Sequence, residues 1–412
     1  MDLSLEHEQF SGDSVVASLD ALARFGGATD GSVTRVAWSG ELFDAYRWTG
    51  DRMRELGLAV EIDPAGNLLG RWEVGKGKPL LVGSHLDSVP SGGHLDGVLG
   101  VVAAVHAVAL LKERGYEPPR PVWIIAFMDE EGARFDTALF GSRAFAGDDL
   151  SGLGDRSDAA GVTLREAMAG AGYDFDRVAD AARADEVGAY LELHIEQGPV
   201  LDHEHLEIGV VTSIVGLRGF RVRMRGQANH AGTTPMRLRR DAFIGAARVA
   251  LALREEACHR ETVTANIGKV TVAPGGANVV PGLADFTIDA RATTSTELRE
   301  IEEFIRVTVA RVAEEERLDV DLEPTFALDP LQLAPEIVDA VERAARTQMA
   351  AVRRMPSGAG HDAQVIGRHV PAGMLFIPSL KGISHSPDEE TLPQHVELGV
   401  CVLAQTITEM LA

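Results

Sequence analysis

The sequence has few of the features that mark secreted or membrane-spanning proteins. Two cysteines, Cys258 and Cys401, are too few for a disulfide framework, and their apolar, helix-like surroundings predict buried free thiols, as in a cytosolic protein. The longest apolar run, residues 98–111, is interrupted by His106 and is too short to cross a bilayer. The N-terminal stretch MDLSLEHEQFSGD has neither the basic nor the apolar region of a signal peptide. We therefore expect a soluble, cytoplasmic protein.

Positive charge is also scarce. Lys and Arg total 39 against 62 Asp and Glu, which gives a net charge of -23. A surface this acidic repels nucleic acid and anionic membranes, so neither is an expected partner. At 412 residues, of which 45% are hydrophobic, the chain is globular in composition but too long for one compact core. Two domains are the natural expectation.

The first half of the chain alternates apolar strands with amphipathic helices. Residues 78–85, 120–131 and 188–201 have the pattern of buried strands, and a helix is expected over residues 97–114. This alternation predicts an α/β fold with a mixed sheet covered by helices. The same pattern resumes after Asp329, so residues 1–212 and 329–412 are predicted to form one domain.

A different pattern occupies the middle of the chain. Four strands and two helices are expected in the order β-α-β-β-α-β, with the strands at 216–226, 262–273, 283–293 and 320–326. This is the ferredoxin-like, or split βαβ, arrangement. Residues 213–328 are therefore predicted to be a smaller domain inserted into the larger one.

Five residues at or just after predicted strands, or in loops of small residues, could bind metal: His85, Asp96, Glu131, His194 and His385. Histidine and carboxylate together suit Zn, Mn, Co or Ni, and one carboxylate can bridge two ions. Each has an ordinary alternative, since a lone histidine such as His194 is more often a hydrogen-bonded core residue. His94, near Asp96, is interpreted as a loop residue, and a role as a rival ligand is the alternative.

The neighbours of these residues strengthen the metal interpretation. Asp87 stands two residues after His85, so it points to the same side of a strand and can orient the imidazole. Glu130 and Glu131 follow VWIIAF, a strand apolar enough to be buried, where carboxylates are costly. One of this pair can bind metal while the other faces the attacking water, although adjacent acids at a turn are commonly only solvated.

The motifs GSHLDSVPSGGHLDGVLGV, DEEGARF, ELHIEQGPVL, GQANHAGTTPM, ANVVPG, DARAT, SGAGHDA and GISHSPDE extend over almost the whole chain. Together they resemble the M20 metallopeptidase/amidase superfamily, within it the branch of N-carbamoyl-L-amino acid hydrolases, allantoate amidohydrolases and β-ureidopropionases. HIEQGP and NHAGTTPM are the most specific to that branch. The resemblance implies a catalytic α/β domain interrupted by a smaller lid or dimerisation domain.

The resemblance also implies roles for individual residues. It makes His85 and His194 ligands of one divalent ion and Glu131 and His385 ligands of a second, with Asp96 bridging the two. Asp87 would support His85 and Glu130 would be the general base. The implied contacts to the substrate and to its oxyanion are His230, Gln197, Asn278, Arg291, His361 and Gly360.

Two of these residues have plain structural alternatives. His230, the implied oxyanion donor, could be a turn histidine beside Gly232, and Arg291, the implied carboxylate ligand, could be a strand-edge arginine facing solvent. Because His230 lies in the inserted domain, it would act by domain closure or from a partner subunit, and the resemblance implies a homodimer through that domain.

The expected activity is metal-dependent hydrolysis of the N-carbamoyl group of N-carbamoyl-L-amino acids, a small-molecule ureido substrate, to amino acid, CO2 and NH3. Allantoate amidohydrolase shares all the motifs and is the first alternative, followed by β-ureidopropionase and by an aminoacylase or dipeptidase. A catalytically inactive metal-binding scaffold is a remote alternative, because such a protein would be expected to lose Glu130 or a ligand. The sequence leaves the native metal, the substrate side chain and the degree of L-selectivity open.

Overall fold

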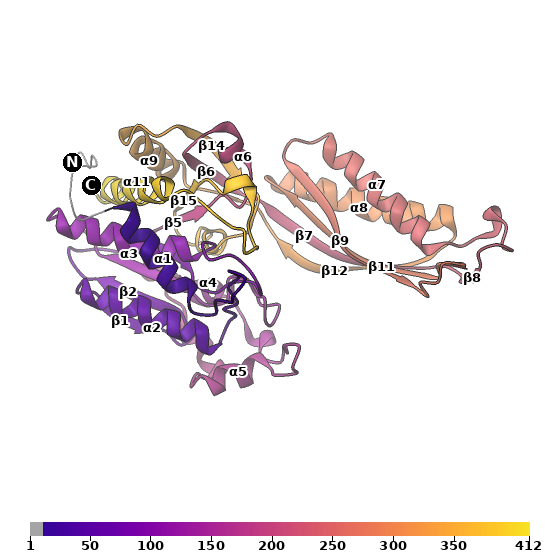
Figure 1. The fold of residues 1–412 in the computed structure, drawn as a ribbon, viewed down its shortest axis with the longest axis horizontal. Helices are drawn as coiled ribbons and strands as arrows, with labels where there is room; N and C mark the ends of the chain where they lie inside the picture. Colours follow the sequence, from indigo (N-terminus) through magenta and orange to yellow (C-terminus); the bar gives the residue numbers. More distant parts are fainter. Residues whose placement is uncertain (1–10) are drawn as a thin grey trace. The chain divides into compact units, whose positions relative to one another are not determined.

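The computed structural model describes residues 11–412, so the acidic stretch at residues 1–10 lies outside the described residues. The described residues form two compact units, residues 11–212 with 332–412 (unit 1) and residues 213–331 (unit 2). Figure 1 shows the helices and strands of each unit. Among residues 11–412, no helix has both the length and the apolar character needed to cross a membrane.

Unit 1 is built on a nine-stranded mixed sheet, which confirms the predicted α/β class. Its strand order is β1-β2-β4-β3-β5-β15-β6-β13, and β14 pairs with β6. The bounds are β1 (Ala59–Ile62), β2 (Leu68–Trp72), β3 (Leu80–His85), β4 (Val122–Phe127), β5 (Ala189–Ile195), β6 (Ile208–Ile214), β13 (Leu331–Gln332), β14 (Val352–Ser357) and β15 (Ala372–Ile377).

The centre of this sheet is parallel. Strands β4, β3, β5 and β15 are neighbours and run in the same direction. Every residue of these four strands is buried. Their continuous apolar sequences are therefore explained by burial on both faces, as is usual for parallel strands covered by helices.

Helices cover the sheet of unit 1. Helix α3 is apolar on nearly all sides because it packs against β3 and β5 and also against α1 and α11. The helices are α1 (Gly12–Ala23), α2 (Gly40–Glu55), α3 (Val98–Glu113), α4 (Phe140–Ala146), α5 (Leu164–Gly170), α6 (Val200–Glu204), α9 (Pro335–Thr347), α10 (Asp362–Ile366) and α11 (Pro393–Leu411). Short 3-10 turns occur at Ser151–Leu153, Phe175–Ala181, Ala184–Glu186 and Leu380–Gly382, and in unit 2 at Met236–Leu238.

Unit 2 is a four-stranded antiparallel sheet with two long helices. Its elements are β7 (Gly216–Arg225), α7 (Ala242–Cys258), β9 (Val263–Ala273), β11 (Leu283–Ala292), α8 (Ser295–Glu316) and β12 (Asp319–Leu328), with a two-stranded ribbon of β8 (Asn229–His230) and β10 (Val279–Val280). The sheet order β12-β7-β11-β9 places the strands as 4-1-3-2 in chain order.

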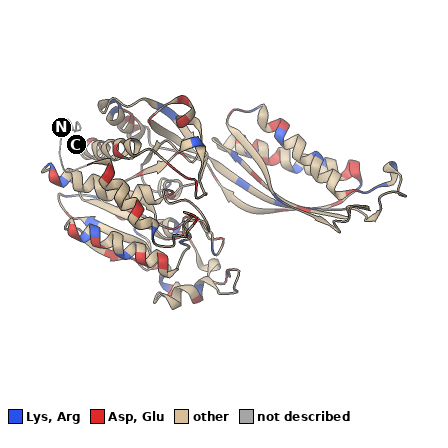
Figure 2. Ribbon diagram, viewed as in Figure 1, with Lys and Arg blue, Asp and Glu red and all other residues tan. Residues whose placement is uncertain are grey.

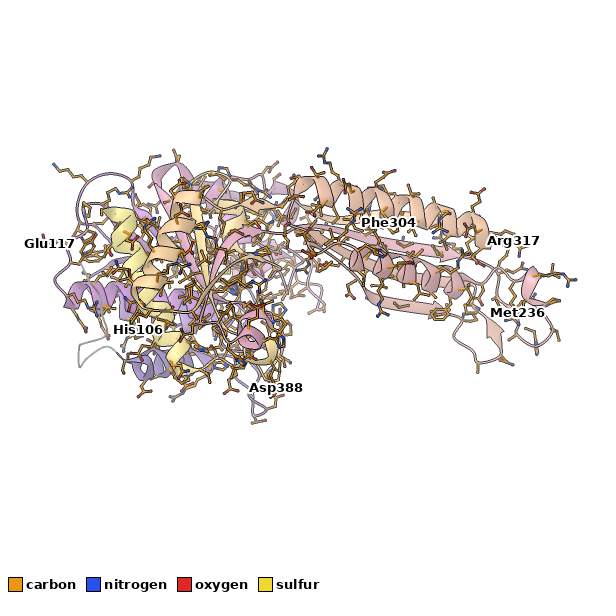
Figure 3. The ribbon with its side chains drawn as sticks, turned by 90° about the horizontal axis from the view of Figure 1, so that it is seen from above. His106, Glu117, Met236, Phe304, Arg317 and Asp388 are labelled. Atoms are coloured by element: carbon orange, nitrogen blue, oxygen red, sulfur yellow. The ribbon has the colours of Figure 1, made fainter. Side chains whose placement is uncertain are left out.

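The core of unit 2 lies between this sheet and its helices. Alternate residues of β11 are buried, and Phe304 of α8 packs against the same core (Figure 3). The chain leaves α8 at Arg317, which adopts the left-handed conformation (Figure 3).

The two cysteines are both free, as predicted, but only Cys401 is buried. The expectation that Cys258 is also buried was wrong. Helix α7 leaves Phe243, Ile244 and Leu251 exposed in this chain, so an apolar setting on this helix does not imply burial.

Candidate metal centre and active site

Acidic residues occur along the helices of both units (Figure 2), but a separate group of carboxylates is buried at one edge of the large sheet. The parallel strands β4, β3, β5 and β15 all end at this edge. His85 is the last residue of β3, Glu130 and Glu131 follow β4, His194 is the penultimate residue of β5, and His385 follows β15. Ligands gather at the carboxyl ends of parallel strands in α/β proteins, because the loops carrying polar groups converge there.

Asp96 reaches the same place from the loop that joins β3 to α3. The loop ends at Gly97, whose φ of 67° is in the left-handed region. A Cβ atom at this position would overlap the His85 ring. Only glycine therefore allows the chain to turn into α3 this close to the imidazole.

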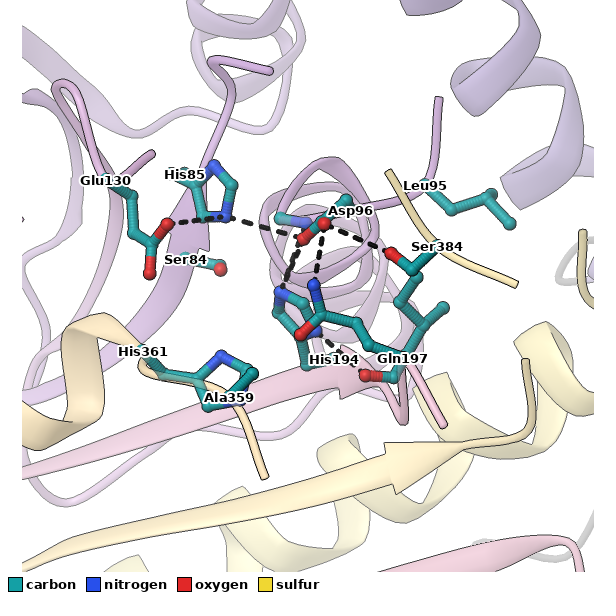
Figure 4. A network of polar contacts seen from close by, with 12 residues as sticks. Ser84, His85, Leu95, Asp96, Glu130, His194, Gln197, Ala359, His361 and Ser384 are labelled. Atoms are coloured by element: carbon teal, nitrogen blue, oxygen red, sulfur yellow. Dashed lines mark hydrogen bonds and ion pairs between the residues drawn. The ribbon is translucent and has the colours of Figure 1, made fainter. Parts of the chain in front are cut away.

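The structure brings the five predicted ligands together in two clusters that share Asp96. The clusters are His85–Asp96–His194 and Asp96–Glu131–His385, and within each the ligand atoms lie within 4.8 Å of one another. Asp96 Oδ1 is 3.2 Å from His194 Nε2 and 3.8 Å from His85 Nε2 (Figure 4). Its other oxygen, Oδ2, is 3.0 Å from His385 Nε2. One carboxylate thus offers one oxygen to each cluster.

Hydrogen bonds fix the ring orientations of both buried histidines. Nδ1 of His194 contacts the carbonyl oxygen of Ile195 at 2.9 Å, and Nδ1 of His85 contacts that of Asp87 at 3.1 Å. A carbonyl only accepts, so the ring proton is on Nδ1 in each case and the lone pair is on Nε2. In His194 this Nε2 also accepts the backbone N–H of Gly97 at 3.2 Å. Both Nε2 atoms face Asp96, as metal ligation requires.

Asp87 connects these histidines to the two glutamates. Its Oδ1 accepts a hydrogen bond from the backbone N–H of Glu130 and its Oδ2 accepts one from that of Glu131, both at 3.2 Å. The same Oδ1 is 3.5 Å from His85 Nδ1. Asp87 therefore holds His85 and the Glu130–Glu131 turn in a fixed relation.

The chemistry of the clusters fits divalent cations. Within residues 11–412, no Lys or Arg forms a salt bridge with Asp96, Glu130 or Glu131, and histidine is the only basic side chain that pairs with these carboxylates. Burial raises the pKa of the Glu131 carboxyl to about 7, and its Oε1 atom is buried without a hydrogen-bond partner. A hydrogen bond to Asp96 is the main reason why the pKa of His385 rises to about 9. A cation among these groups would remove the cost of burying unpaired carboxylates.

A third cluster, Glu192–His194–His361, also has metal-like geometry. However, the Glu192 carboxylate already accepts hydrogen bonds from Ser84 Oγ, Tyr190 OH and the backbone N–H of Ala363. It links β3, β5 and α10, and neither of its oxygens is left without a hydrogen-bond partner, as Glu131 Oε1 is.

Glu130 lies beside the His85 ring, on the side of its Nε2 atom. Its Oε2 is 3.7 Å from His85 Nε2 (Figure 4). Burial raises the pKa of the Glu130 carboxyl well above its ordinary range. This carboxylate is next to the metal-like clusters without belonging to either, which suits a group that accepts and returns a proton.

The predicted substrate contacts of unit 1 lie around the same clusters. Gln197 has φ 58°, and its Nε2 donates to Asp96 Oδ2 at 2.7 Å, while its Oε1 is buried without a partner. His361 is buried, packs edge-on against the His194 ring and contacts Ser357 Oγ through Nε2 at 2.8 Å. Burial lowers the pKa of His361 well below its ordinary range, so this ring is neutral. Gly360, just before it, is exposed.

The other three predicted contacts belong to unit 2. His230 is exposed in the β8–β10 ribbon, and its Nδ1 accepts from the backbone N–H groups of Gly232 and Thr233. The proton of the neutral ring is therefore on Nε2. Asn278 is a neighbour, since its carbonyl accepts from the N–H of Ala231. Arg291 is paired with Asp289 at the opposite end of β11.

His94 is not part of the metal-like clusters found among residues 11–412 and instead lines a cavity of about 660 Å³ together with Leu95 and Leu380. Sequence reasoning missed several residues that hold the site. Ser384 and Glu389 contact the Asp96 loop, and Arg35 is completely buried beside Asp87. Of these, Ser384 and Glu389 stand in the recognised GISHSPDE motif, which was the available signal.

The peptidase family M20/M25/M40 model matches residues 81–409. An N-carbamoyl-L-amino-acid amidohydrolase of Paenarthrobacter aurescens is 42% identical over 90% of this chain and 91% of its own. An allantoate amidohydrolase of Escherichia coli (strain K12) is 36% identical over 96% and 97%. A crystal structure of a hydantoinase/carbamoylase family amidase from Burkholderia multivorans covers 97% of each chain, with a TM-score of 0.90 and 34% identity. The protein is therefore a member of peptidase family M20/M25/M40.

Proposed function

We propose that this protein hydrolyses the N-carbamoyl group of N-carbamoyl-L-amino acids to L-amino acid, CO2 and NH3, using two divalent ions. The observation that carries the proposal is the pair of His/carboxylate clusters that share Asp96. It is supported by the 42% identical relative, which is named for this activity and aligns over nearly the whole chain.

Both cysteines are free thiols, which supports a cytoplasmic location.

The donor set fits two ions, one held by His85, Asp96 and His194 and the other by Asp96, Glu131 and His385. Mixed imidazole and carboxylate ligands accept Zn, Mn, Co or Ni. When bound, such ions supply Lewis-acid activation of the ureido carbonyl and of the attacking water.

Glu130 would move the proton. Its buried carboxylate takes a proton from the attacking water and returns it to the leaving nitrogen, which departs as ammonia. The remaining carbamate then loses CO2 to give the free amino acid. Burial raises the Glu130 pKa, which makes the carboxylate a stronger base than an exposed glutamate.

His230 would stabilise the oxyanion that forms on the ureido carbonyl. Its Nδ1 is occupied by two backbone N–H groups, so its Nε2 carries the proton and can donate to an oxyanion. Arg291 would bind the substrate carboxylate, since a guanidinium pairs with a carboxylate in bidentate fashion. Gln197, Asn278 and His361 would provide the remaining polar contacts.

One copy of unit 2 does not supply both His230 and Arg291 to one substrate. The ribbon that carries His230 extends from the Leu283 end of β11, and Arg291 lies eight residue steps away from Leu283 along that strand. At about 3.3 Å per step the two side chains are about 25 Å apart, far more than a ureido acid spans. We therefore propose a homodimer in which each site takes one of these residues from the partner.

The surface of unit 2 supports such a dimer. Helix α7 exposes Phe243, Ile244 and Leu251, and β9 is an edge strand that exposes Val270. Exposed apolar side chains beside an open strand edge are typical of an interface between copies.

Allantoate is the alternative substrate, because the 36% identical Escherichia coli relative is named for it. N-carbamoyl-β-alanine is a further candidate. An inactive scaffold is disfavoured because Glu130 and all five candidate ligands are present.

The test is ammonia release by metal-reconstituted protein offered N-carbamoyl-L-methionine, its D-isomer, N-carbamoyl-β-alanine and allantoate separately. We expect the L-carbamoyl compound to be preferred and Glu130→Gln to abolish turnover while the protein still binds metal. A preference for allantoate would keep the mechanism and change the substrate. If no compound released ammonia from protein with two ions bound, the proposal would be wrong.

A further inference from the structure

Glu389 is a buried carboxylate that the proposed reaction does not use. It follows His385 by four residues and is only 2% exposed. Its Oε1 accepts hydrogen bonds from the backbone N–H groups of Leu95, at 2.8 Å, and Asp96, at 3.1 Å. Its Oε2 accepts from Ser384 Oγ at 2.8 Å. One side chain therefore bonds to the loop that presents Asp96 and to the segment that presents His385.

The loop that carries Asp96 has the space and the hydrogen-bond donors that the Glu389 carboxylate needs. A Cβ atom on Gly93 would overlap the Glu389 carboxylate, so the loop approaches it at a position where only glycine fits. Two amide donors just before α3 converge on one oxygen, which also places a negative charge near the N-terminus of that helix. The loop thus provides both the space and the hydrogen-bond donors for the Glu389 carboxylate, although 296 positions separate Gly93 from Glu389.

The two halves of the metal centre are held differently. His85 and His194 are part of β3 and β5, whose ladders fix their backbones. His385 lies on an irregular segment, with φ 55° and a side chain that is 49% exposed. Its side chain contacts Asp96 and Glu131. The position of His385 therefore depends on how its segment is tied to the Asp96 loop.

We propose that Glu389 is a positioning residue that keeps His385 in register with Asp96 and so preserves the Glu131–His385 half of the metal centre. This inference rests on the proposed two-ion site. Glu389 does not touch the ligand atoms of that half, and it acts through the backbone of Asp96 and through Ser384. Its removal should weaken the ion held by Glu131 and His385 more than the ion held by His85 and His194.

The experiment is a titration of metal-free full-length protein with Co²⁺, followed by calorimetry and by visible absorption, which reports coordination. Native protein is expected to bind two ions per chain. Glu389→Ala should lower the affinity of one of the two ions by about 10- to 100-fold and leave that of the other within about 3-fold. Glu390→Ala removes an exposed carboxylate from the next position and should change neither affinity.

Two further variants keep the test decisive if Glu389→Ala folds poorly. Glu389→Gln retains an oxygen that can accept both amide donors, so it should bind both ions nearly as native protein does. Gly93→Ala should displace the carboxylate and weaken the same ion, and its effect should not add to that of Glu389→Ala in the double variant.

The outcomes separate the inference from the function on which it rests. If native protein binds fewer than two ions, the two-ion proposal fails and the inference falls with it. If native protein binds two ions and Glu389→Ala binds both with unchanged affinity, only the inference is overturned. Equal losses from Glu389→Gln and Glu389→Ala, or full additivity with Gly93→Ala, would also overturn it.

Discussion

Replacing Asp87 by asparagine changes one atom in a side chain that accepts hydrogen bonds through both of its oxygens. In the native protein, each carboxylate oxygen accepts one backbone N–H, from Glu130 or from Glu131. Asparagine has one accepting oxygen, and its amide nitrogen would face a donor. One of the two N–H groups would therefore lose its partner at a position where the side chain is 1% exposed.

The size of the effect follows from that lost bond. An unsatisfied buried donor costs about 1–3 kcal/mol. Arg35 adds to this cost, because burial lowers its pKa to about 10 and the Asp87 charge is the main group opposing that shift. We expect the free energy of unfolding of metal-free Asp87→Asn to fall by about 1–3 kcal/mol, and metal affinity to fall about 10- to 100-fold because the Glu130–Glu131 turn and His85 shift.

Urea unfolding in chelator measures the stability change, and calorimetric titration measures the metal affinity. Asp388→Asn is the matched control, because Asp388 is exposed near the same edge of the sheet and should alter neither quantity. The reasoning would be refuted if Asp87→Asn unfolded within about 0.5 kcal/mol of native protein, the usual range for surface substitutions, and bound metal with native affinity.

Three further predictions use other parts of the chain. In Gly97→Ala, the alanine would have to keep a left-handed φ, which costs about 1–2 kcal/mol, and its Cβ would overlap the His85 ring. Metal affinity should therefore fall, and native affinity in a titration would contradict this prediction. Burial lowers the pKa of His106 (Figure 3) to about 4, against about 6.5 in an unfolded chain. The unfolded chain therefore gains the proton first as pH falls, and native protein should lose about 2 kcal/mol of stability between pH 7 and pH 5. Urea unfolding of His106→Gln should lack that loss, and an unchanged pH dependence would count against the burial argument. A thiol reagent should modify Cys258 in native protein and Cys401 only after unfolding, because Cys401 is buried with a pKa raised to about 12; two thiols modified at equal rates would contradict it.

The candidate metal ligands could be predicted because the sequence pattern that indicates them is local. His85, Glu131 and His194 each stand at the end of an apolar segment that reads as a buried strand, and parallel strands bring such ends to one edge. Asp96 and His385 lie in loops, where their residue types among small residues made them candidates, and the family resemblance assigned their roles as bridging ligand and second-ion ligand.

The supporting contacts could not be predicted in the same way. Glu389 and Gln197 contact the Asp96 loop from positions about 290 and 100 residues away, and nothing in the local sequence specifies those pairs. The exposure of Cys258 was mispredicted for a related reason. Apolar periodicity marks a face that needs covering, and it does not tell whether the same chain or another copy covers it.

Anomalous diffraction from crystals grown with Mn²⁺ or Zn²⁺ tests the central claim most directly. We expect two peaks per chain, one between His85 and His194 and one between Glu131 and His385, with an Asp96 oxygen beside each. A single peak, or a peak between Glu192 and His361, would contradict the two-ion centre bridged by Asp96.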